Sequence, residues 1–502
     1  PPGVALHRTV CRVPDHRLWE LDAPHLYHLT VRAQQCGSCS ADQGTVRFGF
    51  RDFRFADGVF RFNGRPLFLN GCMHTPEYPV SYVLPHDRDY PRRDIIAMKA
   101  MGFNFCRVAF GTLTPQQLDL CDELGLLVLQ SHRGCWQLDW KFREWPGMEK
   151  EFDRSIAEVV LRDRNHPSVV VWDWMNETLE GRLFRHAVAE LAFLRQLDET
   201  RAVLLNSGRS DQCRSIPDLS NPGSATWDAR VRDAHLYPVV PHTARISRAL
   251  RTVPGGPFIL TEYSQCDALD CPAMLRRFEQ LGFAHGDDAA FCRQLWERFL
   301  QDWERWRLGE CWARPEDFFV ESHRNVARLR RAGAEEVLAN PNLVGHTLWN
   351  SLVDLYHGAG SLNVFREFKP DHADLMAEMS RPLRWCLFPE PLNVYRGRSI
   401  HLEAVLVNHG VLRPGPYPVR FQVVSADGRE RLFDRVVAIR VPGSPPFAVP
   451  VFSSSMRMAV PAGGYRFLAT FQRAAAAAGG ETLVRVFDPV ELPVLRHEVA
   501  LA

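Results

Sequence analysis

The stretch SVVVWDWMNETLEG, residues 168–181, begins as an apolar run and then turns polar. Its valines and first tryptophan predict a strand that is buried on both faces. Asn176 and Glu177 follow this strand almost at once. A carboxylate in that place either lies in the first turn of the next helix or belongs to a functional site at the strand end. The rest of the sequence decides between these two interpretations.

Seven more short apolar runs resemble this one, and segments of helical period lie between most of them. The eight runs cover residues 66–71, 103–109, 125–130, 168–174, 202–207, 232–237, 257–263 and 343–349. Eight buried strands with intervening helices predict a (β/α)8 TIM barrel. A doubly wound sheet is the alternative, but no glycine-rich phosphate turn follows any of the runs. The long segment between the seventh and eighth runs is predicted to be a partly helical insertion at the active-site face.

On both sides of this region the apolar period changes to two, which predicts strands. In residues 1–52, Tyr27, Leu29 and Val31 fall on one face. These strands are too few for a domain, so we interpret them as the C-terminal part of an immunoglobulin-like β-sandwich whose first strands would precede this sequence. Residues 391–502 alternate in the same way, for example at Leu402 and Ala404, and predict a second sandwich. The predicted fold class is therefore α/β, with a TIM-barrel domain at 53–390 between two β-sandwich segments.

The composition excludes several classes of function. The 502 residues include 60 Lys and Arg against 59 Asp and Glu, and this balance gives no basis for binding nucleic acid or an anionic membrane surface. No apolar run is long enough to span a membrane, so a soluble protein is expected, although the compartment is not indicated. Cys36 and Cys39 form the one C-x-x-C pair, without the second pair that a zinc site needs. We expect no metal and no cofactor, and a homo-oligomer is compatible with the sequence.

Polar side chains gather where the predicted strands end. Two of them are carboxylates, Glu177 and Glu262, and the other candidates are His74, Arg107, Asn176, His235, Tyr237 and Trp349. Because strand ends of a TIM barrel meet around one cavity, we expect the two acids to face each other. Two carboxylates at one cavity are the minimum for hydrolysis of a glycosidic bond, with one as acid and the other as nucleophile. A carbohydrate substrate also suits the many aromatic residues.

Several stretches resemble glycoside hydrolase family 2 in that family's order. RDRNHPSVVVWDWMNET at 162–178 is similar to the segment that carries the acid/base, and GPFILTEYS at 256–264 to the segment that carries the nucleophile. FRFNGRPLFLNGCMH, MKAMGFNFCRVAF and LDLCDELGLLVLQ also look like family 2 sequence. The resemblance implies a retaining exo-β-glycosidase that needs no cofactor.

The resemblance also implies a role for each matching residue. Glu177 would be the general acid/base and Glu262 the nucleophile. Asn176 would bind the sugar 2-hydroxyl, Arg107 would lie below the site, and Tyr237 would lie near the nucleophile.

Departures from the family pattern bear on the sugar. Phe110 stands where many galactosidase- and glucuronidase-like members have a histidine, and RVAFG is closer to mannosidase-like members. Asn363, Val364 and Phe365 stand where glucuronidase-like members carry an N-x-K element, so a uronic acid is disfavoured. The resemblance as a whole implies a β-galactosidase- or β-mannosidase-like activity.

Other interpretations of the same residues stay open at this point. Asn176 could be a plain helix N-cap, Arg107 a structural ion pair and Tyr237 a core residue. The protein could also be an endo-acting β-glycanase of the same clan, or a barrel that binds carbohydrate without cleaving it.

Overall fold

The computed structural model describes residues 8–34, 41–75, 77–81, 85, 87–108, 111–132, 145–208, 216–237, 244–252, 255–263, 268–349, 352, 358–443, 445–473 and 476–490. Its centre is a curled parallel sheet in which β14 pairs with β6, and the order runs β10-β9-β8-β7-β6-β14-β13-β12. The strands are β6 (Leu69–His74), β7 (Phe105–Val108), β8 (Leu127–Ser131), β9 (Val169–Asp173), β10 (Ala202–Leu204), β12 (Arg232–Leu236), β13 (Phe258–Tyr263) and β14 (Leu343–Leu348). The short β11 (Leu219–Ser220) adds to β10 in the antiparallel direction. Each predicted apolar run thus contributes one strand.

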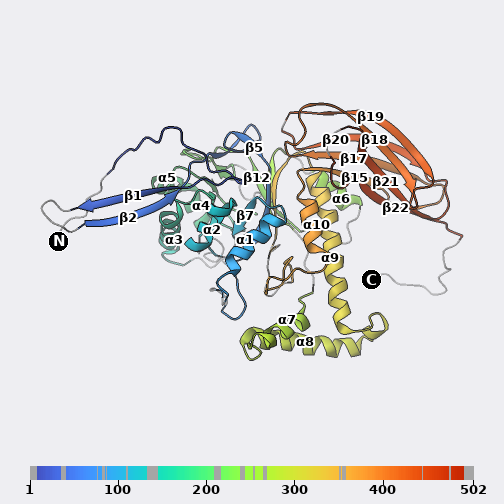
Figure 1. Ribbon diagram of the computed structural model, residues 1–502, viewed down its shortest axis with the longest axis horizontal. Coiled ribbons are helices and arrows are strands. Elements are labelled where there is room, and N and C mark those ends of the chain that lie inside the picture. Colours follow the sequence, from blue (N-terminus) through green and yellow to red (C-terminus); the bar gives the residue numbers. More distant parts are fainter. Residues whose placement is uncertain are drawn as a thin grey trace.

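Helices cover the outside of this sheet (Figure 1). They are α1 (Tyr90–Ala100), α2 (Pro115–Leu124), α3 (Met148–Asp163), α4 (Arg182–Ala189), α5 (Leu191–Leu197), α6 (Ala244–Arg251), α9 (Pro315–Leu338) and α10 (His372–Met379). The ends of α2 follow from local chemistry. Thr114 and Gln117 form a capping box at its start, and Gly125 ends it with a φ of 73°. Its buried Leu118 and Cys121 lie one turn apart and face the sheet.

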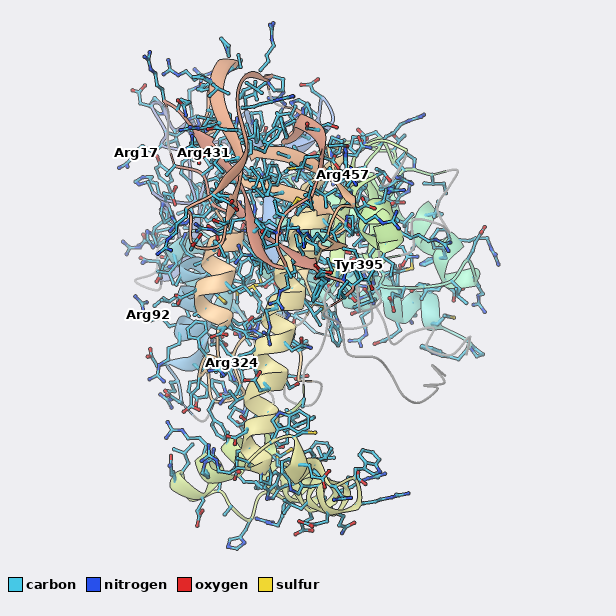
Figure 2. All side chains as sticks on the ribbon, turned by 90° about the vertical axis from the view of Figure 1, so that its right-hand side faces the viewer. Arg17, Arg92, Arg324, Tyr395, Arg431 and Arg457 are labelled. Atoms are coloured by element: carbon cyan, nitrogen blue, oxygen red, sulfur yellow. The ribbon has the colours of Figure 1, made fainter. Side chains whose placement is uncertain are left out.

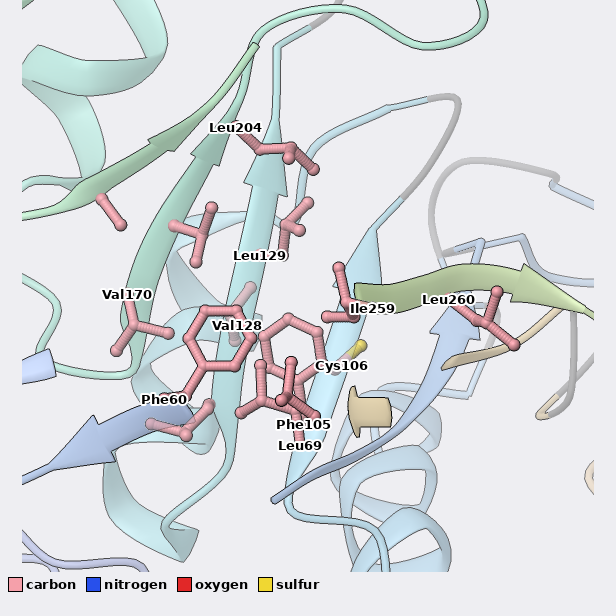
Figure 3. Close-up of a cluster of buried hydrophobic side chains, with 14 of the residues drawn as sticks. Phe60, Leu69, Phe105, Cys106, Val128, Leu129, Val170, Leu204, Ile259 and Leu260 are labelled. Atoms are coloured by element: carbon pink, nitrogen blue, oxygen red, sulfur yellow. The ribbon is translucent and has the colours of Figure 1, made fainter. Parts of the chain in front are cut away.

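The barrel core is apolar and extends to a small sheet below the strands. This sheet consists of β3 (Phe53–Ala56), β4 (Val59–Phe62) and β5 (Arg65–Leu67). Figure 3 shows Phe60 of β4 among buried side chains from the barrel strands, including Phe105, Val128 and Val170. Burial of these large side chains provides most of the free energy that holds strand to strand and helix to sheet.

The chain between β13 and β14 forms the predicted helical insertion. It contains α7 (Cys271–Gln280), α8 (Asp287–Arg305), the 3-10 helix η2 (Leu308–Glu310) and α9. Figure 2 shows α9 running from the body of the molecule to a lobe at its end, with Arg324 on its course. Because the insertion leaves the C-terminal end of β13, it begins at the face of the barrel where the strand ends gather.

The flanking regions form further sheets. β1 (Tyr27–Gln34) and β2 (Ala41–Phe48) pair in the antiparallel direction, and Leu29, Val31 and Val46 on them are exposed. The C-terminal region has one sheet of β15 (Leu383–Glu390), β17 (Ser399–Asn408) and β20 (Ala448–Arg457). A second sheet contains β16 (Asn393–Tyr395), β22 (Glu481–Phe487), β21 (Gly463–Phe471), β18 (Gly415–Ser425) and β19 (Arg431–Val441).

These two C-terminal sheets share one apolar core, in which Trp385 and Leu402 of the first lie with Phe421 and Phe467 of the second. β15 precedes the boundary expected at residue 390 and pairs with β17 along its whole length. The immunoglobulin-like class of the flanking sheets stays a prediction.

Candidate active site

Arg107, Asn176 and Glu262 meet at the C-terminal ends of the barrel strands. The Arg107 guanidinium donates from Nη1 to Glu262 Oε1 at 2.5 Å and from Nη2 to the side-chain oxygen of Asn176. The hydroxyl of Tyr237 donates to the other oxygen of Glu262. Arg107 and Glu262 are buried, whereas Tyr237 is 48% exposed. Both oxygens of the Glu262 carboxylate therefore accept hydrogen bonds, one of them from a cation.

Glu177 lies across from Glu262, with His235 between them. The Nδ1 atom of His235 is 2.8 Å from Glu177 Oε1 and 3.3 Å from Glu262 Oε2. One oxygen of each carboxylate and a ring nitrogen of His235 all lie within 4.8 Å of one another. The Glu177 side chain is 38% exposed, so the acid is open to solvent while Glu262 is not. The structure thus brings together the two acids at one site.

The backbone around Glu177 does not match the helix-cap interpretation. Helix α4 begins only at Arg182, beyond Gly181. Asn176 forms a parallel bridge with Ser207, and Glu177 has a φ of 52°, in the left-handed region. That conformation costs a non-glycine residue about 1 to 3 kcal/mol and tends to occur at functional sites.

Charge and burial set the protonation of the groups around Glu262. Burial alone would lower the pKa of Arg107, but the charges of Glu262 and Asp173 raise it above its usual value. Burial and the charge of Glu262 raise the pKa of Tyr237 far above its usual value, so this hydroxyl stays a donor. Burial raises the pKa of Asp173 to about 7, against the pull of Arg107.

Several residues that the sequence did not single out support the site. Asp173 Oδ2 is 3.6 Å from Arg107 Nη2 and accepts a hydrogen bond from Ser131. The Nε2 atom of His235 is 3.1 Å from Thr261 Oγ1, and Thr261 donates to Asp233. Alternation along the strands could have identified Asp173, Thr261 and Asp233 as polar residues at barrel positions, but nothing local indicates their partners.

Gly208 makes room for the His235 ring. A Cβ atom on Gly208 would lie 2.4 Å from His235 Nδ1, and the residue has a φ of 76°. Any other residue here would displace the imidazole that lies between the two acids.

Trp349 and His74 occupy different surroundings. The half-buried Trp349 meets Tyr237 edge to face, with 5.9 Å between ring centroids, and so lies beside the site. His74 is buried at the end of β6, 3.7 Å from Asp94, and burial lowers its pKa to about 4. The contacts of His74 within the described structure are thus with α1 and not with the two acids.

Trp227 packs on Trp174 and donates to Val188, so it is a core residue. Cys36, Cys39 and Phe110, which were considered from the sequence, lie outside the described residues.

Two groups of side chains in the described part of the chain are close enough together to bind a metal ion. They are Glu177, His235 and Glu262, and Asp119, Asp122 and His166. In each group a guanidinium already contacts one of the two acids, namely Arg107 on Glu262 and Arg47 on Asp119. Part of the negative charge that would attract an ion is therefore already offset.

Comparison with known proteins identifies the family. Residues 53–301 match the TIM barrel domain described as "Glycosyl hydrolases family 2, TIM barrel domain". The barrel of this chain is a glycoside hydrolase family 2 domain. The chain is 30% identical over 203 residues to a protein named beta-galactosidase BoGH2A of Bacteroides ovatus. The matched segment makes up 40% of this chain and 23% of that protein. The match therefore covers less than a quarter of the length of that curated relative.

Solved structures show the same fold. A family 2 beta-galacturonidase from Eisenbergiella tayi, bound to galacturonate, superposes with a TM-score of 0.54 at 17% identity, over 74% of this chain and 60% of that one. A beta-glucuronidase from Parabacteroides merdae gives a TM-score of 0.51 at 17% identity, over 94% of this chain and 55% of that one.

Among the described residues, the helices are all too short or too polar to cross a membrane.

Proposed function

We propose that this family 2 member is a retaining exo-β-glycosidase that removes terminal β-linked sugars by double displacement. The observation that carries the proposal is the pair of carboxylates, Glu177 and Glu262, since one oxygen of each lies within 4.8 Å of the other. Retaining glycosidases hold their two carboxyl groups about 5 to 5.5 Å apart, whereas inverting enzymes leave room for a water molecule between them.

Glu262 is the nucleophile in this mechanism. Arg107 and Tyr237 donate hydrogen bonds to its two oxygens and orient the carboxylate, which attacks the anomeric carbon. Glu177, the more exposed acid, gives its proton to the departing aglycone oxygen. In the second step Glu177 takes a proton from water, which displaces Glu262 and releases the sugar.

Asn176 and the aromatic residues bind the sugar. The side-chain oxygen of Asn176 accepts from Arg107, so its NH2 group is the one that can donate to a sugar hydroxyl. Tyr237 and Trp349 form an aromatic pair beside Glu262, where a pyranose ring could pack its apolar face.

A neutral sugar such as galactose or mannose fits the proposal better than a uronic acid. The loop after β14 uses Asn363 internally, because its side chain accepts from Phe365 N and donates to Glu367. Val364 and Phe365 are buried in the core of the insertion. The two cations nearest in sequence have partners elsewhere, since Lys369 donates to the carbonyl of Gly358 and Arg366 pairs with Asp94. The beta-galactosidase among the relatives supports a galactoside, whereas the uronidases share the fold at 17% identity.

The test is release of nitrophenol from β-galactoside, mannoside, glucoside, glucosaminide and glucuronide substrates, with Glu262→Gln beside the wild type. We expect the variant to lose at least about a thousandfold in kcat/KM, the size of covalent and electrostatic catalysis. Glu336→Gln, at another buried glutamate on α9, is the matched control. Near-normal turnover by Glu262→Gln would end the assignment, and sugar binding without turnover would favour a non-catalytic barrel. Internal cuts in a polysaccharide would favour an endo-acting glycanase.

A further inference from the structure

We propose that Asn206 is a positioning residue that holds Glu177 in place through the backbone of Thr178. The inference rests on the proposed role of Glu177 as acid/base. Asn206 lies just beyond β10, at the C-terminal end of the strand next to β9. It is fully buried, and its side chain acts on the main chain.

The main chain of the β10 extension fixes the approach to Glu177. Trp174 N donates to Leu204 O at 3.0 Å, and Ser207 N donates to Met175 O at 2.7 Å. Glu177 N then donates to Ser207 O at 2.8 Å. This ladder ends at Glu177, where φ turns to 52° and the chain leaves the strand direction. A second attachment beyond the turn is therefore needed to hold the left-handed conformation.

Asn206 supplies that attachment. Its Oδ1 atom accepts from Thr178 N at 3.1 Å, and its Nδ2 atom donates to Thr178 O at 2.8 Å. Thr178 is itself buried, so both of its backbone groups depend on partners inside the protein. The amide side chain thus bonds both backbone groups of Thr178, as a neighbouring strand would, and clamps the residue after Glu177. Without it, two buried polar groups lose their partners, and the turn would relax towards an ordinary φ that swings the Glu177 carboxylate away.

The nucleophile does not depend on this clamp. Glu262 lies within β13, paired with His235 of β12, and is held by Arg107 and Tyr237. Loss of the Asn206 side chain should therefore impair protonation of the aglycone and spare the attack by Glu262. That asymmetry gives a kinetic signature that loss of stability alone does not produce.

The experiment compares Asn206→Ala with wild type on two aryl glycosides of the sugar that wild type cleaves fastest. A dinitrophenyl group departs without a proton, whereas a phenyl group needs one. The matched control is Asn340→Ala, because Asn340 is also buried and also bonds backbone on both sides, donating to Leu250 O and accepting from Asn342 N. It lies just before β14, at the opposite end of the barrel strands.

We expect Asn206→Ala to lower kcat/KM for the phenyl glycoside by about 10- to 100-fold and for the dinitrophenyl glycoside by less than about threefold. Asn340→Ala should leave the ratio of the two values unchanged. Asn206→Asp, which keeps the acceptor and loses the donor, should give a smaller loss of the same kind and serves if the alanine variant does not fold. Equal losses on both glycosides, or an equal shift of the ratio by Asn340→Ala, would overturn the role of Asn206. Turnover of neither substrate by wild type would overturn the proposed function and this inference with it.

Discussion

Arg107 and Glu262 are 155 positions apart in the sequence and form a buried ion pair, with 2.5 Å between Nη1 and Oε1. The same guanidinium binds Asn176 and lies 3.6 Å from Asp173. One side chain at the end of β7 therefore orders groups from β9 and β13. Because it is cut off from water, its charge acts on Glu262 with little screening.

Replacing Arg107 with lysine should break this pair of hydrogen bonds while keeping the positive charge. A lysine ammonium is a point charge and cannot donate to Glu262 and Asn176 in the fixed geometry of a guanidinium. We expect Arg107→Lys to lose about 100-fold or more in kcat/KM on nitrophenyl glycosides. Arg330→Lys, at a buried arginine that bonds the carbonyl of Ala359, controls for the general cost of the exchange. A loss within threefold for Arg107→Lys would show that charge alone suffices.

Removing the carboxyl of Glu177 should separate the two chemical steps. In the Glu177→Ala variant, Glu262 should still attack a dinitrophenyl glycoside, because that aglycone leaves without a proton. In the second step, however, water would lack its general base. Added azide needs no base, so we expect it to raise kcat about tenfold or more and to yield a β-glycosyl azide. Product analysis by NMR checks this expectation. If azide leaves the rate unchanged, or an α-azide forms, the assignment of Glu177 is wrong.

Tyr237→Phe deletes one hydrogen bond to the nucleophile. We expect kcat to fall about 10- to 100-fold, because the hydroxyl donates to the carboxylate that leaves in the second step. The melting temperature should change little, since Tyr237 is half exposed. Tyr263→Phe is the control, because within the described structure the buried Tyr263 hydroxyl makes no hydrogen bond. Equal activity of the two variants would contradict a role for the Tyr237 hydroxyl.

Asp173 should make the stability of the protein depend on pH. Burial raises its pKa from 3.8 to about 7, so the carboxyl is neutral in the folded protein at a pH where it is ionised in the unfolded chain. Its contribution to stability is complete below about pH 4 and is lost as the pH rises to about 7. Asp173→Asn should therefore gain stability relative to wild type over that range, by roughly 2 to 4 kcal/mol. Urea unfolding at several pH values measures this, and a difference that does not change with pH would refute it.

The strand positions could be predicted from the sequence because each buried parallel strand is a short apolar run between helices. The same pattern placed Glu177 and Glu262 at strand ends. Partners across strands could not be predicted in this way. The approach of Asp173 to Arg107 and the clamp of Asn206 on Thr178 depend on how β9 aligns with its neighbours, and that register is a property of the folded sheet. His74 ends a barrel strand as expected, yet its nearest charged partner is Asp94 on α1, which no local signal indicates.

The place of β15 has a practical consequence for protein production. Its Arg384 donates to Glu335 on α9 and to the carbonyl of Met379, while its backbone completes the sheet with β17. A gene truncated after residue 390 would encode a barrel that ends in an unpaired strand with an apolar face, which invites aggregation. A stop codon placed just after α10 would avoid that edge, although it would also remove Arg384 from Glu335. Recombinant work on the barrel is therefore better served by retaining the C-terminal sheets.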